Sequence, residues 1–156
     1  MSHTFADVDA SGDPGGAVAC QERLAAWPAI AAYKEHSRAL LGPERPVLDV
    51  GCGPGVDLVA LGPGAVGLDR SAAMCRSAAG RGARACLGDA HAVPFADACF
   101  AGARADRVLQ HLADPVRALG ELVRVTRPGG RVVVADPDQE SLVIEVPGVR
   151  AGLLAR

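Results

Sequence analysis

The chain has 156 residues, of which 49% are hydrophobic but only 3% are aromatic, and its formal net charge is −2. This length is typical of a single domain. A charge so close to neutrality does not predict a polyanionic partner, so the composition speaks against nucleic-acid binding.

The cysteines and the hydropathy of the chain indicate the cellular compartment in which the protein is expected. The five cysteines are odd in number and no two have C-x-x-C spacing, which argues against a disulfide framework and against a structural zinc site. A reducing cytoplasmic location fits this pattern best. The first ten residues do not resemble a signal peptide, and no apolar run approaches roughly 18 residues, so neither export nor a membrane partner is expected.

The N-terminal part reads as a polar lead-in followed by helices. Residues 1–16 are polar and rich in glycine, and residues 18–41 carry a helical apolar pattern that Pro28 divides in two. We expect a broken apolar stripe formed by Leu24, Trp27, Ile30, Ala31, Leu40 and Leu41.

From residue 47 onward, short apolar runs alternate with helical or glycine-rich pieces. Strands are predicted at residues 47–50, 65–68, 83–87, 100–105 and 131–135, and a helix at 115–126. Asp114 suits the N-cap of that helix and Pro115 its first turn, with Val116, Leu119, Leu122 and Val123 on one face. Residues 127–130, RPGG, are expected to form the turn into the last strand. Such alternation predicts an α/β fold with a doubly wound, mostly parallel sheet.

The segment VLDVGCGPG, residues 47–55, is a strand that runs into a glycine-rich turn. Such a turn brings backbone close to a bound ligand. A phosphate-binding P-loop is excluded because no Lys-Ser or Lys-Thr pair follows. The third glycine of a dinucleotide site is also missing, since position 56 is valine. A nicotinamide-dependent oxidoreductase therefore remains a weaker alternative.

The G-x-G-x-G pattern resembles motif I of class I S-adenosylmethionine-dependent methyltransferases. The likeness continues through residues 66–74, 88–97, 105–115 and 122–138, in the order of that family's motifs. The stretch GDAHAVPFAD, residues 88–97, is similar to the small-molecule, ubiquinone-methyltransferase-like branch. The resemblance implies a Rossmann-like fold, S-adenosylmethionine as cofactor and methyl transfer to a small-molecule acceptor, with a role in secondary metabolism.

The resemblance also assigns roles to single residues. Gly51, Cys52 and Gly53 present backbone to the amino-acid end of the cofactor, and Asp49 orients their loop. Asp69 accepts hydrogen bonds from the ribose, with Arg70 beside it. Asp89 and Ala90 meet the adenine, Met74 lies against its ribose side, and the Arg107 carbonyl faces the cofactor ammonium group. His111 is the candidate catalytic base, and no metal is expected.

The chain departs from the family pattern at its C-terminal end, where the final helix and antiparallel strand pair have no counterpart. SLVIEV, residues 141–146, has room for one more short strand or the start of a helix. Three explanations stay open: a fragment, a homodimer that covers the open sheet edge, or a minimal fold. We expect residues 1–41 to form the lead-in and helices, and residues 42–156 the cofactor-binding domain. A protein that binds the cofactor without methylating, as a partner subunit or a repurposed cyclase, is the alternative function.

Overall fold

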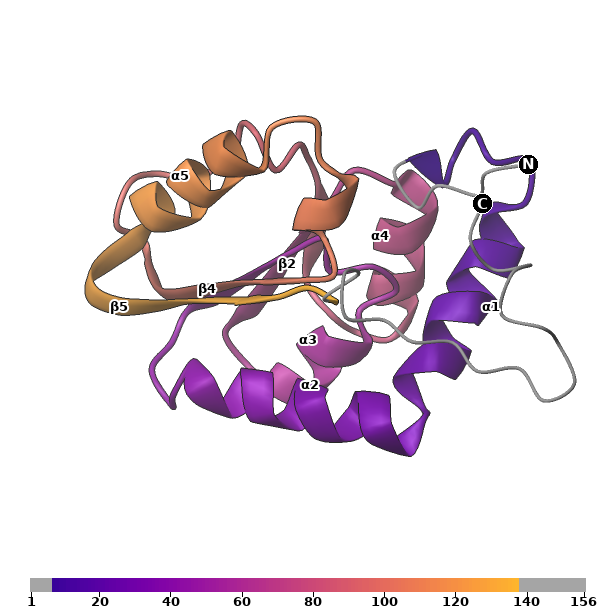
Figure 1. Cartoon of the computed structure of the whole chain (residues 1–156), viewed down its shortest axis with the longest axis horizontal. Helices are drawn as coiled ribbons and strands as arrows, with labels where there is room; N and C mark the ends of the chain where they lie inside the picture. The colour runs from indigo at the N-terminus through magenta and orange to yellow at the C-terminus, as the bar shows by residue number, and fades with distance from the viewer. Residues whose placement is uncertain (1–6, 138–156) are drawn as a thin grey trace, which may run out of the picture.

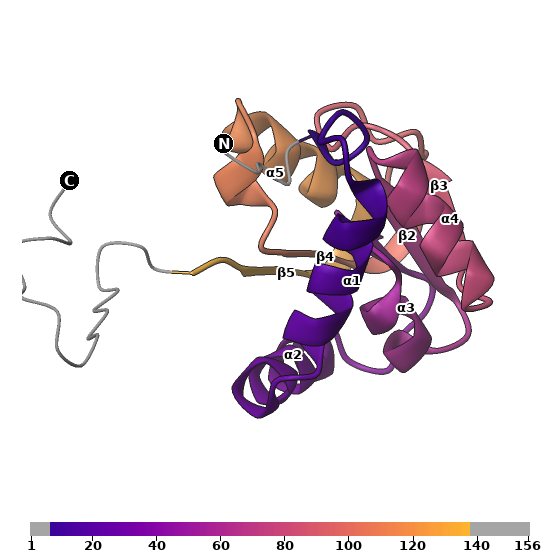
Figure 2. The same cartoon turned by 90° about the vertical axis from the view of Figure 1, so that its right-hand side faces the viewer.

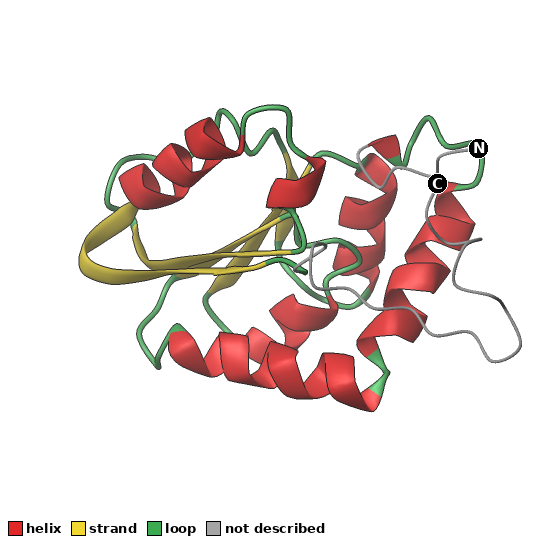
Figure 3. Cartoon of the chain, viewed as in Figure 1, coloured by secondary structure: helices red, strands yellow, loops and turns green. Residues whose placement is uncertain are grey.

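The computed structural model describes residues 7–137. Its five parallel strands form one open sheet in the order β3-β2-β1-β4-β5. The strands are β1 (Val47–Val50), β2 (Ala65–Asp69), β3 (Ala85–Leu87), β4 (Phe100–Asp106) and β5 (Thr126–Ala135). The helices are α1 (Pro14–Ala25), α2 (Pro28–Leu40), α3 (Val56–Leu61), α4 (Ala72–Gly80) and α5 (Pro115–Val125), with a 3₁₀ turn, η2 (Leu109–His111). Figure 3 shows this alternation of helix and strand, which confirms the predicted doubly wound α/β fold.

Helices cover the sheet on both faces, with α5 above it and α2 and α3 below in the view of Figure 1. Each face has its own apolar core. One core joins Leu48, Val50 and Ala103 to Leu122 of α5. The other joins Val47 to Leu58 of α3 and to Leu41. Because successive side chains of a strand point to opposite faces, Asp49 and Arg104 lie on the side of α2 and α3.

The first helix lies beside the sheet. Figure 2 shows α1 running alongside α4 and down to α2, and both helices contact it. It begins at Pro14, within the stretch expected to be lead-in, because the Asp13 side chain accepts a hydrogen bond from the Gly16 N–H at 2.8 Å. Val8, in the same stretch, is buried.

Two predicted helix faces are right only in part: Leu122 in α5 and Leu41 after α2 are buried, but other members of each set are exposed. In α5 the buried residues are Ala118, Leu122 and Val125, whereas Val116 is 76% and Val123 62% exposed. In α2 the expected apolar stripe leaves Leu40 exposed, and the buried side chains are Lys34 and Ser37. Trp27, just before α2, is exposed as well. The buried face of α2 is polar because carboxylates of the sheet and of α3 oppose it.

The turn expected at residues 127–130 lies inside β5. Thr126 pairs with Phe100 and Arg131 pairs with Gly102, so the intervening residues form an irregularity in the ladder. Residues 141–146, where a further strand or helix start was expected, lie outside the described residues. None of the helices described between residues 7 and 137 is long and apolar enough to span a bilayer.

Candidate functional site

One cavity of about 470 Å³ opens at the carboxyl ends of the strands. In the order β3-β2-β1-β4-β5, connections leave β1 and β4 in opposite directions, and such a switch point is where open α/β sheets bind ligands. All eleven residues that the sequence nominated line this cavity: Asp49, Gly51, Cys52, Gly53, Asp69, Arg70, Met74, Asp89, Ala90, Arg107 and His111.

The glycine loop is fastened to β2 by its own N–H groups. Gly51 and Cys52 both donate to the Leu68 carbonyl, at 2.7 and 3.1 Å, and Gly53 donates to the Asp69 carboxylate at 2.8 Å. Gly51 has a φ of +67°, and a Cβ there would lie 2.3 Å from a Val108 methyl carbon. The loop therefore shapes the cavity wall, while its three N–H groups serve the protein and not a ligand.

Asp69 ends β2 with both carboxylate oxygens engaged. Oδ2 accepts from Gly53 and Oδ1 accepts from the Ser71 N–H at 2.9 Å. Burial raises the pKa of Asp69 above its usual value, although these two hydrogen bonds oppose the shift. The carboxylate thus connects the glycine loop to the start of α4.

The segment before α1 contacts the start of α4, next to Asp69. Asp9 accepts hydrogen bonds from the Ser71 hydroxyl and the Ala72 N–H, both at 2.7 Å, and these bonds lower its pKa. The Ser71 hydroxyl in turn accepts from the Met74 N–H at 3.2 Å and caps α4. Met74 is buried against the cavity. Residues before the first helix therefore help to build the wall that follows Asp69.

Asp89 lies at the end of the cavity next to β3 and is bonded to a histidine. Its Oδ1 accepts from the His91 N–H at 2.8 Å and lies 2.7 Å from His91 Nδ1, and the backbone bond is the first cause of its lowered pKa. His91 also lines the cavity. The sequence reading did not single it out, although it lies two residues from Asp89 in the same motif.

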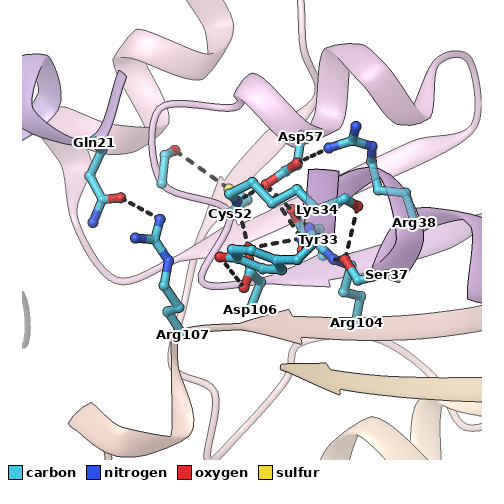
Figure 4. A network of polar contacts seen from close by, with 12 residues as sticks. Gln21, Tyr33, Lys34, Ser37, Arg38, Cys52, Asp57, Arg104, Asp106 and Arg107 are labelled. Atoms are coloured by element: carbon cyan, nitrogen blue, oxygen red, sulfur yellow. Dashed lines mark hydrogen bonds and ion pairs between the residues drawn. The ribbon is translucent and has the colours of Figure 1, made fainter. Parts of the chain in front are cut away.

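Six charged side chains meet beneath the cavity, and we call them the buried charge cluster: Lys34, Arg38, Asp49, Asp57, Arg104 and Asp106. Figure 4 labels all of these residues except Asp49. Lys34 pairs with both Asp57 and Asp106. Arg104, which is 1% exposed, bonds Asp49 at 3.1 Å and Asp106 at 2.9 Å. The β1–β4 register places Asp49 directly opposite Arg104. Three cations thus balance three carboxylates.

The pKa values in the buried charge cluster move in different directions. Burial raises the pKa of Asp49 to about 6, although Arg104 opposes the change. Burial also disfavours the charged form of Asp57, but Arg104 and Lys34 outweigh it and lower its pKa. Nearby Tyr33 donates to Asp106 at 3.1 Å, and burial, followed by the Asp106 charge, raises the Tyr33 pKa to about 12. The Asp49 carboxyl group therefore titrates close to the neutral range.

The sequence reading missed four members of this cluster that line the cavity: Lys34, Asp57, Arg104 and Asp106. One signal was available. An arginine between alanines in a strand predicted to be buried requires carboxylate partners. The partners themselves come from positions far apart, as with Lys34 and Asp106, and only the folded arrangement brings them together.

Arg107 follows β4 directly and has a left-handed backbone, with a φ of +56°. Its N–H donates to the Ala135 carbonyl at 2.7 Å, and one terminal nitrogen of its guanidinium donates to Gln21 Oε1 of α1 at 3.2 Å (Figure 4). Its Nε is buried and has no hydrogen-bond partner among the described residues. His111, in η2, lines the cavity one turn further along.

Residues 48–134 match the family model described as a methyltransferase domain. The chain belongs to the methyltransferase family. This methyltransferase is 41% identical over 139 residues to an uncharacterized 37.1 kDa protein in transposon TN4556 of Streptomyces fradiae, covering 81% of the chain and 40% of the relative. It is 39% identical over 109 residues to a demethylmenaquinone methyltransferase of Mycolicibacterium paratuberculosis. This match covers 67% of the chain and 47% of that relative.

Among solved structures, the methyltransferase is similar to an S-adenosylmethionine-dependent methyltransferase from Thermotoga maritima, a possible histamine N-methyltransferase. The TM-score is 0.64 and the identity 27%, over 86% of this chain and 60% of the other. These matches place the chain among class I small-molecule methyltransferases. It spans less than half the length of the two curated relatives.

Proposed function

We propose that this methyltransferase binds S-adenosylmethionine across the carboxyl ends of its strands and transfers the methyl group to a small-molecule acceptor. The observation that carries the proposal is the convergence of all eleven predicted residues on one cavity. Its volume of about 470 Å³ lies within the range of roughly 300–1,000 Å³ for small-molecule sites. We also propose residues 42–156 as the cofactor-binding unit, with α1 and α2 added to it.

The side chains fit the chemistry of this cofactor along the sheet edge. Asp69, at the end of β2, is an acceptor suited to ribose hydroxyls. Asp89, beyond β3, is an acceptor suited to the adenine amino group, and both of its bonds to His91 use Oδ1 alone. Asp49 and the Arg107 carbonyl face the β1–β4 end, where an ammonium group finds negative charge. The fit therefore covers the ribose, the adenine amino group and the ammonium group of the cofactor.

When bound, S-adenosylmethionine supplies a methyl group on a positively charged sulfur. The protein has to hold an acceptor atom in line with that carbon and exclude water from the cavity. We assign the acceptor proton to His111, which lies in η2 on the cavity wall. Arg107 and His111 are four positions apart in the chain, so cofactor and acceptor contacts come from one short segment after β4.

Titration calorimetry with S-adenosylmethionine and S-adenosylhomocysteine is the first test, with the mass in solution measured on the same sample. One-to-one binding is the expected result, and a folded sample that binds neither compound contradicts the proposal. The mass also tests the predicted homodimer. Turnover is then assayed with demethylmenaquinone, the acceptor in a relative's name. Binding without turnover on any acceptor favours the non-methylating alternative.

The cytoplasmic location and the role in secondary metabolism stay predictions. The five cysteines are free thiols, in keeping with a reducing compartment. Cys52 is buried, and burial raises the pKa of its thiol, so we assign it no redox role.

A further inference from the structure

We propose that the Arg107 side chain, held by Gln21 of α1, is the receptor for the α-carboxylate of the cofactor. This inference rests on the proposed function and adds a role for the guanidinium to the one given to the Arg107 carbonyl. It also gives α1 a part in cofactor binding. An anion at that end of the cavity needs donors that are not already used within the protein.

The glycine loop does not supply these donors. The N–H groups of Gly51, Cys52 and Gly53 donate to the Leu68 carbonyl and the Asp69 carboxylate, and Gly55 donates to the Cys52 carbonyl. Pro54 has no N–H group. A carboxylate at the β1–β4 end therefore needs a donor from outside residues 51–55.

Two of the four lysine and arginine side chains on the cavity wall are already paired with carboxylates. Lys34 is bound by Asp57 and Asp106, and Arg104 by Asp49 and Asp106. Arg70 lies at the other end of the cavity, where its charge acts on Asp69 and Asp89. Among the described residues that line the cavity, Arg107 is the cation at the β1–β4 end that has no ion pair within 4.0 Å.

Gln21 holds the Arg107 guanidinium in place, but not all of its hydrogen-bond donors have a partner. Of its five N–H donors, one donates to Gln21 Oε1, a neutral acceptor, and the buried Nε–H has no partner among the described residues. A buried donor left unpaired is unfavourable. The terminal N–H groups that Gln21 does not use are the donors from which a carboxylate can accept.

The backbone of Arg107 gives independent support. A φ of +56° in a residue other than glycine is strained, and such strain concentrates at functional sites. The bond from the Arg107 N–H to the Ala135 carbonyl holds this conformation against β5. The strained turn directs the residue out of the sheet ladder at the place where the cavity opens.

The order of the strands gives the direction of the bound cofactor. Asp89 follows β3, Asp69 ends β2 and Arg107 follows β4, so the three residues lie in a line across the sheet edge with β1 between the last two. A cofactor with its adenine at Asp89 and its ribose at Asp69 brings its amino-acid end to Arg107. A carboxylate on the acceptor molecule is the other candidate partner of the Arg107 guanidinium. The experiment distinguishes it from the cofactor carboxylate.

The experiment measures affinity by calorimetry for two ligands, S-adenosylmethionine and its decarboxylated form, S-adenosylmethioninamine. Arg107→Gln is expected to weaken binding of S-adenosylmethionine about tenfold or more, the scale of a hydrogen bond between charged groups. Binding of the decarboxylated form is expected to change less than about twofold. Arg107→Lys keeps part of the preference for the carboxylate because it keeps the charge.

Arg70→Gln is the matched control, since it removes a cation from the same cavity at its other end. It is expected to change both affinities by the same factor. Equal losses for the two ligands in Arg107→Gln, in a sample with an unchanged circular dichroism spectrum, overturn the inference. Unchanged affinities for both also overturn it and point to an acceptor carboxylate. If the wild-type chain binds neither ligand, the proposed function itself is wrong.

Discussion

Burial sets the charge of Asp49, a single residue beneath the glycine loop. Its side chain is 3% exposed and bonds Arg104, yet its pKa is raised from 3.8 to about 6. The loss of hydration thus outweighs the attraction of one arginine that two other carboxylates share. A proton bound here near neutral pH changes the charge of the whole buried cluster.

This shift predicts how stability depends on pH. Between about pH 4 and 6 the folded protein keeps a proton on Asp49 that the unfolded chain has released, so the contribution of Asp49 to stability falls as the pH rises through that window. Asp49→Asn resembles the protonated form and lacks this loss. The difference in the free energy of unfolding, Asp49→Asn minus wild type, is expected to increase from pH 4 to pH 6, as measured by urea unfolding. A difference that stays constant with pH contradicts the raised pKa.

Two glycines with positive φ allow the effect of backbone strain on cofactor affinity to be distinguished from the effect of contact with the ligand. Gly53 and Gly62 have φ values of +54° and +77°, and a Cβ on either meets nothing within 4 Å, but only Gly53 lines the cavity. Substitution of either by alanine should cost about 1–2 kcal/mol of stability, measured by denaturant unfolding. Only Gly53→Ala should also weaken S-adenosylmethionine binding. A similar loss of affinity in Gly62→Ala would mean that strain alone explains the effect.

At the scale of elements, α5 shows how a helix is fixed at its start. The Asp114 carboxylate accepts from the Arg117 N–H at 2.9 Å, and Pro115 occupies the first turn. Both features were predicted from the sequence and are confirmed, because capping depends on residues a few positions apart.

Loss of the α5 cap should be measurable. Asp114→Ala is expected to lower the free energy of unfolding by about 1 kcal/mol, since the Arg117 N–H loses its acceptor. Asp114→Asn keeps a side-chain oxygen and should lose only a fraction of this. Thermal denaturation followed by circular dichroism at 222 nm distinguishes the variants. Equal destabilisation of both would show that the carboxylate charge matters more than the cap.

Helix faces were harder to predict than helix ends. The apolar residues of α5 form a wide stripe opposite Arg117, Glu121 and Arg124, and only one edge of this stripe is buried. The sequence pattern therefore did not distinguish the buried Leu122 and Val125 from the exposed Val116 and Val123. In α2 the pattern failed for the opposite reason, because the buried face carries Lys34 and Ser37. Sequence patterns assume that buried means apolar, and a helix that packs on carboxylates breaks that assumption.

At the scale of the whole molecule, the buried charge cluster connects four elements: α2, α3, β1 and β4. The motifs of residues 47–138 were enough to predict the sheet and the eleven cavity residues, since each motif is local. The cluster depends on strand register and on pairs as distant as Lys34 and Asp106. The sequence therefore predicted the cavity wall but not the ion pairs beneath it.

Lys34→Met tests how far the fold depends on the cluster. The variant removes one of the two buried cations, Lys34 and Arg104, that contact both Asp57 and Asp106, and breaking a buried pair on one side typically costs about 3–5 kcal/mol. Urea unfolding is expected to show a loss of this size. Arg81→Met, which removes a half-exposed pair with Glu22, is the control and should lose less than about 1 kcal/mol. Similar losses for both would show that the buried cluster adds little to stability.

Lys34 is also the only lysine in the chain, so its ammonium group and the N-terminal amine are the two primary amines of the protein. Its side chain is 8% exposed and is held between two carboxylates. Amine-directed acylating reagents should therefore spare Lys34 in the native state and modify it once α2 separates from the sheet. The mass added at this one position then reports the opening of α2 from the rest of the fold, without any engineered label.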